Sequence, residues 1–259
     1  MRNIWSIFKK EIISFFSSPI AYMLITVYLV LSGYFFYLGF VRFANYVNMV
    51  AANPQYSQQL AQLNLAEHVL RPLSYNICIV VLLLIPMLTM RLYSEENKMG
   101  TMELLLTSPL GYFEIVFGKF FASLFVYAIM MLFSAVYLFI IISYGKIEMG
   151  PIITSYLGLF LIGMAFLSIG NFTSTLTKNQ VVAAVLGFGI LLLFWVLGWG
   201  AANSEGRMAG LLSSLSITEH FDSFSKGVLT LKDIIYYLSF TFIGLFLTKA
   251  SLESTKWRL

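Results

Sequence analysis

The sequence predicts an all-α membrane protein with six transmembrane helices. Hydrophobic residues make up 59% of its 259 residues, charged residues make up only 11%, and the mean hydropathy is +0.84. Soluble domains carry about 25% charged residues, so this composition is typical of a protein that lies in lipid. Six apolar runs are long enough, or nearly so, to cross a bilayer core about 30 Å thick as helices. We expect one membrane domain over residues 1–259.

The first 18 residues precede any span and are predicted to form an amphipathic helix. Apolar side chains recur at helical spacing, and we expect the helix to lie in the headgroup plane of the membrane. The residues assigned to this interfacial helix are Trp5, Phe8, Lys9, Lys10 and Ile12. Ser18-Pro19 then provides a start signal for the first span, because proline is tolerated in the first turn of a helix. The alternative is an anchor with no further role.

The six predicted spans are residues 20–41, 72–90, 120–145, 152–177, 179–204 and 232–248. The first has 22 residues without a charge, which corresponds to about 33 Å of helix. The last has an unbroken apolar run of only 15 residues, from Ile234 to Thr248, so it needs flanking leucines or a thinner bilayer to reach across. Small residues in the fourth span predict close helix packing, and they are Gly158, Gly163, Ser168 and Gly170.

Two connecting segments are long enough to carry structure of their own. Residues 42–71 are polar and predict a turn followed by a short helix. Residues 205–233 mix leucine and phenylalanine with charged side chains. That mixture predicts short helices that dip into the outer leaflet before the last span.

The basic residues predict the orientation, because cytoplasmic loops carry an excess of lysine and arginine. Six spans put both termini on one side of the membrane. That side would hold ten basic residues: Arg2, Lys9, Lys10, Arg91, Lys98, Lys119, Lys178, Lys249, Lys256 and Arg258. The other side would hold six: Arg42, Arg71, Lys146, Arg207, Lys226 and Lys232. We therefore expect both termini in the cytoplasm.

Several classes of function are disfavoured. No Asp, Glu, Lys, Arg or His lies deep in the first five predicted spans, which argues against ion-coupled transport. Gly118-Lys119 is not part of a phosphate-binding loop, because Phe120 stands where serine or threonine is needed. Cysteine and histidine are not at metal-ligand spacing, and scattered basic residues do not indicate nucleic acid binding. The chain is predicted not to be an enzyme, and to depend on another protein for energy.

The most informative stretch is the charge-dense segment from Arg91 to Pro109, between two long apolar runs. It predicts a short amphipathic helix at the membrane surface that another protein can bind. The simpler interpretation is a solvated charged loop.

Three motifs lie between or beside the predicted spans. The first is Glu95-Glu96-x-x-x-Gly100-Thr101-x-Glu103-Leu104-Leu105-Leu106-Thr107-Ser108-Pro109, followed by Gly118-Lys119-Phe120. The second is Ser174-x-Leu176-Thr177-x-Asn179-Gln180-x-Val182-Ala183. The third is His220-Phe221-x-x-Phe224-x-Lys226-Gly227, then Asp233. Together these motifs resemble the ABC-2 type permeases, the membrane subunits of ABC exporters. The resemblance covers nearly the whole chain and is closest to the permeases associated with bacterial gliding motility.

The resemblance implies a set of partners. Two permeases, either two copies or this chain and a related membrane subunit, would pack together on two copies of an ABC ATPase. ATP and Mg would be bound by that ATPase, and no cofactor or metal by this chain. A periplasmic or membrane accessory protein is a further possible partner. The location implied is the bacterial cytoplasmic (inner) membrane.

The resemblance also implies a coupling helix at Thr101–Thr107, between spans two and three. Thr101 can cap it, its apolar residues can enter a groove on the ATPase, and acidic residues can pair at the rim. The residues so assigned are Glu95, Glu96, Gly100, Thr101, Met102, Glu103, Leu104, Leu105, Leu106 and Pro109. The interfacial helix would be the second contact with the ATPase.

In the resembled family, spans one, two and five line the route of transport. The candidates here are Asn76, Phe188, Phe194 and Trp195. Aromatic residues in spans more often only pack or anchor, and that alternative stays open.

The outer segment before the last span is the candidate outer gate, with Glu219, His220, Phe221 and Asp222. A mechanical device that moves an external partner without transporting a substrate is the rival function. A scaffold that uses no energy is the third, but it would not need a coupling helix.

Overall fold

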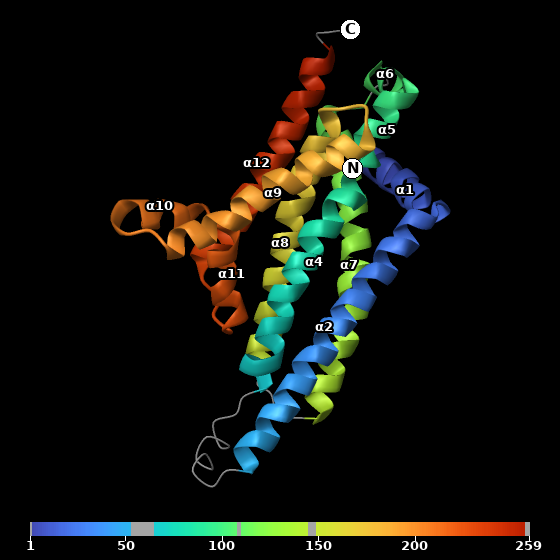
Figure 1. The fold of residues 1–259 in the computed structure, drawn as a ribbon. Helices are drawn as coiled ribbons and strands as arrows, with labels where there is room; N and C mark the ends of the chain where they lie inside the picture. Colours follow the sequence, from blue (N-terminus) through green and yellow to red (C-terminus); the bar gives the residue numbers. More distant parts are fainter. Residues whose placement is uncertain (1, 53–64, 108–109, 145–148, 257–259) are drawn as a thin grey trace.

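The computed structural model describes residues 2–52, 65–107, 110–144 and 149–256. These residues form helices and contain no strand. Six helices in this part of the chain are long and apolar enough to cross a membrane. The predicted all-α fold with six candidate spans is therefore confirmed (Figure 1).

The order of the elements is α1 (Arg2–Ser17), α2 (Pro19–Ala51), the π-helix η2 (Ala66–Leu70), α4 (Arg71–Thr89), α5 (Arg91–Met99), α6 (Thr101–Thr107), α7 (Tyr112–Tyr144), α8 (Met149–Thr175), α9 (Gln180–Ala202), α10 (Gly206–Leu215), α11 (Ile217–Ser225) and α12 (Leu231–Lys256).

Helix α8 is the centre of the bundle and packs against α4, α7, α9, α11 and α12. Its glycines allow this close packing. A Cβ atom on Gly163 would lie 2.0 Å from Cε1 of Tyr127, and one on Gly170 would lie 2.1 Å from Oγ1 of Thr89. The predicted role of the small residues in the fourth span is confirmed.

Helix α2 begins where the sequence predicts and extends beyond the predicted span. Ser18 caps the helix, because its hydroxyl accepts a hydrogen bond from the Ile20 amide at 3.4 Å, and Pro19 follows as the first helical residue. The helix does not stop at residue 41 but continues to Ala51. Aromatic packing accounts for the extension, since Tyr46 stacks on His68 of η2 at a ring distance of 5.6 Å. The expected loop helix falls largely on residues 53–64, outside the described residues.

Two other helices also extend beyond the predicted spans. Helix α7 begins at Tyr112 instead of residue 120, so Lys119 belongs to a helix and not to a loop. Helix α12 continues to Lys256 instead of ending at residue 248. Lys249 and Glu253 form an ion pair of 3.0 Å on this extension, and the Lys249 ammonium lies 4.8 Å from the ring centroid of Phe113.

The bundle has two distinct ends (Figure 1). Helices α1, α5 and α6 and the C-terminal part of α12 lie at one end, which we call the α6 end. The N-terminus of α4 lies with α11 toward the opposite end, where Arg71 contacts Asp222, and we call this the α11 end. Helix α4 stands between α2 and α9 and contacts both.

Candidate functional site

The segment between α4 and α7 folds into two short helices with a sharp turn between them. Gly100 ends α5 in the left-handed conformation, with φ of +71°, a region that glycine occupies without the strain of a side chain. Thr101 then begins α6, and its hydroxyl donates a hydrogen bond of 3.4 Å to the Glu96 carbonyl. The turn directs α6 away from the bundle (Figure 1).

Helix α5 is capped from another helix. Its first N–H groups have no partner within the helix, as at any helix start. The hydroxyl oxygen of Ser174, at the end of α8, accepts hydrogen bonds from the amides of Tyr93 at 3.0 Å and Ser94 at 3.3 Å. The same hydroxyl donates to the carbonyl of Met90 at 2.9 Å. The position of α5 is thereby tied to the central helix.

Some side chains of α6 are exposed, and others pack against the rest of the protein. Leu104 is 71% exposed and Glu103 is exposed, whereas Leu105 is half-buried against the core. Met102 is only 4% exposed and packs inside the core. The side chain of Leu106 and the whole of Pro109 lie outside the described residues.

Beneath α5 lies a group of four charged residues, Lys10, Glu11, Glu96 and Lys119, which we call the charge cluster. The Lys119 side chain is only 1% exposed. Its ammonium donates to Oε1 of Glu11 at 2.8 Å and to the Leu92 carbonyl at 2.6 Å, and it lies 3.1 Å from Oε2 of Glu96. A buried ammonium needs such partners, because desolvation of an unpaired charge costs several kcal/mol.

Lys10 completes the charge cluster at the surface. Its ammonium donates to Oε1 of Glu96 at 2.9 Å, while 61% of the side chain stays exposed. Burial lowers the pKa of Lys10, but the hydrogen bond and charge of Glu96, with the charge of Glu11, outweigh burial and raise the pKa above its usual value. The two lysines and two carboxylates balance in charge and join α1, α5 and α7.

Glu96 lies inside the charge cluster and not at the surface. The residue was expected to pair with basic groups of a partner at the rim, but it is buried and both lysines of the charge cluster contact it. Glu95 is half-buried on the same helix. Of the three acidic candidates, Glu103 is the most clearly presented to the surroundings.

Gly118 explains how α1 reaches α7 closely enough for these ion pairs. A Cβ atom on Gly118 would lie 2.7 Å from Cγ2 of Ile7, so any larger residue would push α1 away. Ile7, Glu11 and Phe15 form the buried face of α1. A carboxylate at helical spacing between two buried apolar residues is the sequence signal for this site, and Glu11 was not among the residues predicted from the sequence.

The predicted interfacial residues fall on the other faces of α1. Trp5 is exposed and its ring stacks on that of Phe8 at 5.1 Å. Phe8 and Ile12 are half-buried against the core, and Lys9 is exposed. This leaves Trp5 free to contact lipid while Ile7 and Phe15 hold the helix to the protein.

At the α11 end, the candidate gate residues have partners within the chain. The carboxylate of Asp222 lies 2.6 Å from the Arg71 guanidinium, accepts a hydrogen bond of 2.9 Å from the Tyr75 hydroxyl and pairs with Lys226. Burial raises the pKa of Asp222, but the bonds from Lys226, Arg71 and Tyr75 outweigh it and lower the pKa below its usual value.

His220 forms a second internal pair. Its Nδ1 lies 2.6 Å from the carboxylate of Asp233, its Nε2 lies 3.2 Å from the Ser214 carbonyl, and its ring stacks on Tyr236. Phe221 is buried, and only Glu219 of the four candidates is exposed.

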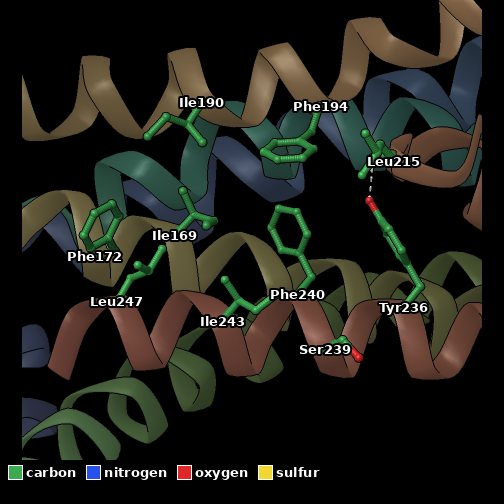
Figure 2. A pocket seen from close by; sticks show the side chains of 10 residues that line it. All are labelled: Ile169, Phe172, Ile190, Phe194, Leu215, Tyr236, Ser239, Phe240, Ile243 and Leu247. Atoms are coloured by element: carbon green, nitrogen blue, oxygen red, sulfur yellow. Dashed lines mark hydrogen bonds between the residues drawn. The ribbon is translucent and has the colours of Figure 1, made fainter. Parts of the chain in front are cut away.

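The four candidate pathway residues lie in different surroundings. Trp195 is buried in the core, and Phe188 and Asn76 are half-buried on α9 and α4. Phe194 instead contacts Phe240 of α12, with ring centroids 4.9 Å apart, and lines an apolar groove (Figure 2). Within the described ranges, no group of three or more histidine, cysteine or acidic residues could hold a metal ion.

These features define a helical, multi-pass membrane protein with a helix presented at one end of its bundle. A family model described as "ABC-2 family transporter protein" matches residues 5–250, so the chain belongs to this family of transporter membrane proteins. Such permeases normally lack a nucleotide-binding domain of their own and generally pair with ABC ATPases. A comparison with curated proteins found no match.

Proposed function

We propose that the chain is the permease subunit of an ABC exporter and that a separate ATPase drives it through α6. The observation that carries this proposal is that the exposed α6 continues from α5, whose Glu96 lies in the buried charge cluster. A force on α6 is therefore passed to α1 and α7 by ion pairs and to α8 by the Ser174 hydrogen bonds. A scaffold has no need of such a connection.

Contact with the ATPase is assigned to Leu104, Glu103 and the exposed end of α5. Burying one leucine contributes roughly 1.5–3 kcal/mol, which corresponds to about a tenfold to hundredfold change in affinity. Lys9 and Lys10 lie on the adjacent α1 and provide the second contact.

Pairing of two permeases is assigned to the face formed by α2, α4 and α9. Helix α4 is mostly buried, yet Ile79, Leu83 and Met87 are exposed at helical spacing between its two neighbours. An exposed apolar stripe on an otherwise buried helix fits contact with a second copy or a related subunit. The substrate route would then lie between the two faces.

Helices α10 and α11 are assigned to an outer gate. Asp222 and His220 are satisfied by residues of the same chain, as a closing element requires. In the rival mechanical function, the same segment would bind an external partner. The orientation proposed places both termini and α6 in the cytoplasm of a bacterium.

The test is a co-purification of the chain with its ATPase from membranes. We expect Leu104→Glu to lower the recovered ATPase at least tenfold while the permease still inserts. Leu176→Glu is the matched control, because Leu176 is an exposed leucine in the turn between α8 and α9. Normal recovery with Leu104→Glu would refute the coupling role of α6.

A further inference from the structure

An apolar groove lies on the side of the bundle away from α4, between α9 and α12 with α8 as its floor (Figure 2). Its volume is about 460 Å³. Ile169 and Phe172 line it from α8, Ile190 and Phe194 from α9, and Phe240 and Ile243 from α12. Ile243 is more than half exposed, so the groove opens to the surroundings of the bundle. All three helices are candidate spans, and the groove therefore faces lipid.

One end of the groove is closed and the other is open. The Tyr236 hydroxyl donates a hydrogen bond of 2.7 Å to the carbonyl of Leu215, the last residue of α10, and this contact closes one end (Figure 2). Phe172 and Leu247 lie at the opposite end, toward the turn that joins α8 to α9. Lys178 lies in this turn and is exposed, and it forms no ion pair with any residue in the parts of the chain that the structure describes.

The length of the groove matches one leaflet of a bilayer. From Tyr236 to Leu247 the helix rises about 16 Å, at roughly 1.5 Å per residue. Half of a hydrocarbon core is about 15 Å thick. A lipid acyl chain that enters beside Lys178 and ends at Tyr236 would thus extend from the headgroup region of the leaflet at the α6 end to the middle of the membrane.

We propose that this groove binds one acyl chain of an anionic phospholipid from the leaflet at the α6 end, with the headgroup beside Lys178. The lining offers an acyl chain apolar contact along its length, and the lysine complements a negative headgroup. The site is separate from the route assigned to the face of α2, α4 and α9. It goes beyond the proposed function, since a lipid bound there stabilises the α8–α9–α12 packing whether or not anything is transported.

The test uses the full chain in nanodiscs of phosphatidylcholine that contain phosphatidylglycerol with a photoreactive diazirine in one acyl chain. Adducts are mapped by mass spectrometry. We expect labelling of the α12 peptide that contains Phe240 and Ile243. Ile243→Trp fills the groove and should lower this labelling at least fivefold. The matched control is Ile235→Trp, because Ile235 is an equally exposed isoleucine on α12 that does not line the groove, and it should leave labelling unchanged.

A second pair of variants tests the headgroup. Lys178→Gln should lower labelling by the phosphatidylglycerol probe about threefold without affecting labelling by a phosphatidylcholine probe. Arg207→Gln, at an exposed arginine on α10, should change neither.

Three outcomes would contradict the proposal. If Ile243→Trp is labelled as fully as the native protein, with unchanged thermal stability, the groove does not bind the acyl chain. An Ile243→Cys variant in a Cys78→Ser background that forms disulfide-linked dimers in place of lipid adducts would assign the groove to a second copy. If Lys178→Gln lowers labelling by both probes equally, the headgroup beside Lys178 need not be anionic, and that part of the proposal is wrong.

Discussion

The Lys119 ammonium lies 2.8 Å from the Glu11 carboxylate, although the two residues are 108 positions apart in the sequence. The pair joins the interfacial helix α1 to the first buried turns of α7. Glu96 brings α5 to the same ammonium. The proposed energy coupling requires this junction to hold α1, α5 and α7 together.

Removing the Lys119 charge should destabilise the protein. Lys119→Met leaves two carboxylates at the site with Lys10 as the remaining cation, and breaking a buried pair in this way costs roughly 3–5 kcal/mol. Lys98→Met is the control, because Lys98 is exposed on α5, and it should change stability by less than about 0.5 kcal/mol. Unfolding titrations in mixed micelles measure both variants. Equal stability of the two would mean that the charge cluster does not hold α1, α5 and α7 together.

A methyl group at Gly118 should separate α1 from α7. In Gly118→Ala the new Cβ meets Ile7 at 2.7 Å, so α1 must shift and the Lys119–Glu11 bond must lengthen. We expect faster proteolysis within α1 and a lower thermal midpoint. Gly189→Ala on α9 is the matched control, because nothing lies within 4 Å of its added Cβ, and alanine favours a helix by roughly 0.5–1 kcal/mol. A midpoint for Gly118→Ala at or above that of Gly189→Ala would contradict the close contact.

The stability contribution of Asp222 should depend on pH. Because its pKa in the folded protein is below the usual 3.8, the ionised group stabilises the fold above that pH, and the contribution is lost as the pH falls through the folded value. The thermal midpoint of native protein minus that of Asp222→Asn should be positive and constant from pH 5 to pH 8, and should shrink below about pH 4. A difference that grows on acidification would exclude a stabilising role for the ionised carboxylate.

The orientation predicted from the basic residues can be tested by labelling single cysteines in a Cys78→Ser background. Lys10→Cys and Lys256→Cys should react only from the cytoplasm, and Gln58→Cys and Glu219→Cys only from outside. Gln58 lies outside the described residues, but Glu219 is exposed on α11, which lies away from the α6 end. Labelling of position 219 from the cytoplasmic side would reverse the orientation and exclude an ATPase contact at α6.

The sequence by itself determined the features that depend on local composition and spacing. Six apolar runs specified the candidate spans, and Ser18-Pro19 specified the start of α2. These features were predictable because hydropathy and capping act between residues that are close in the chain. Helix ends that extend beyond the apolar runs, at Ala51 and Lys256, were not predictable in the same way, since the extensions contact other parts of the chain, Tyr46 with His68 and Lys249 with Phe113.

Only the tertiary structure decided which charged residues meet. Lys119 was counted as a cytoplasmic cation and Glu96 as a rim acid, yet they share one buried site with Glu11. Arg71 and Asp222 meet across 151 positions, and Phe194 lines a groove between α9 and α12. The physical reason is that burial turns a charge that water would solvate into one that needs a partner, and the partner is chosen by helix packing and not by sequence spacing.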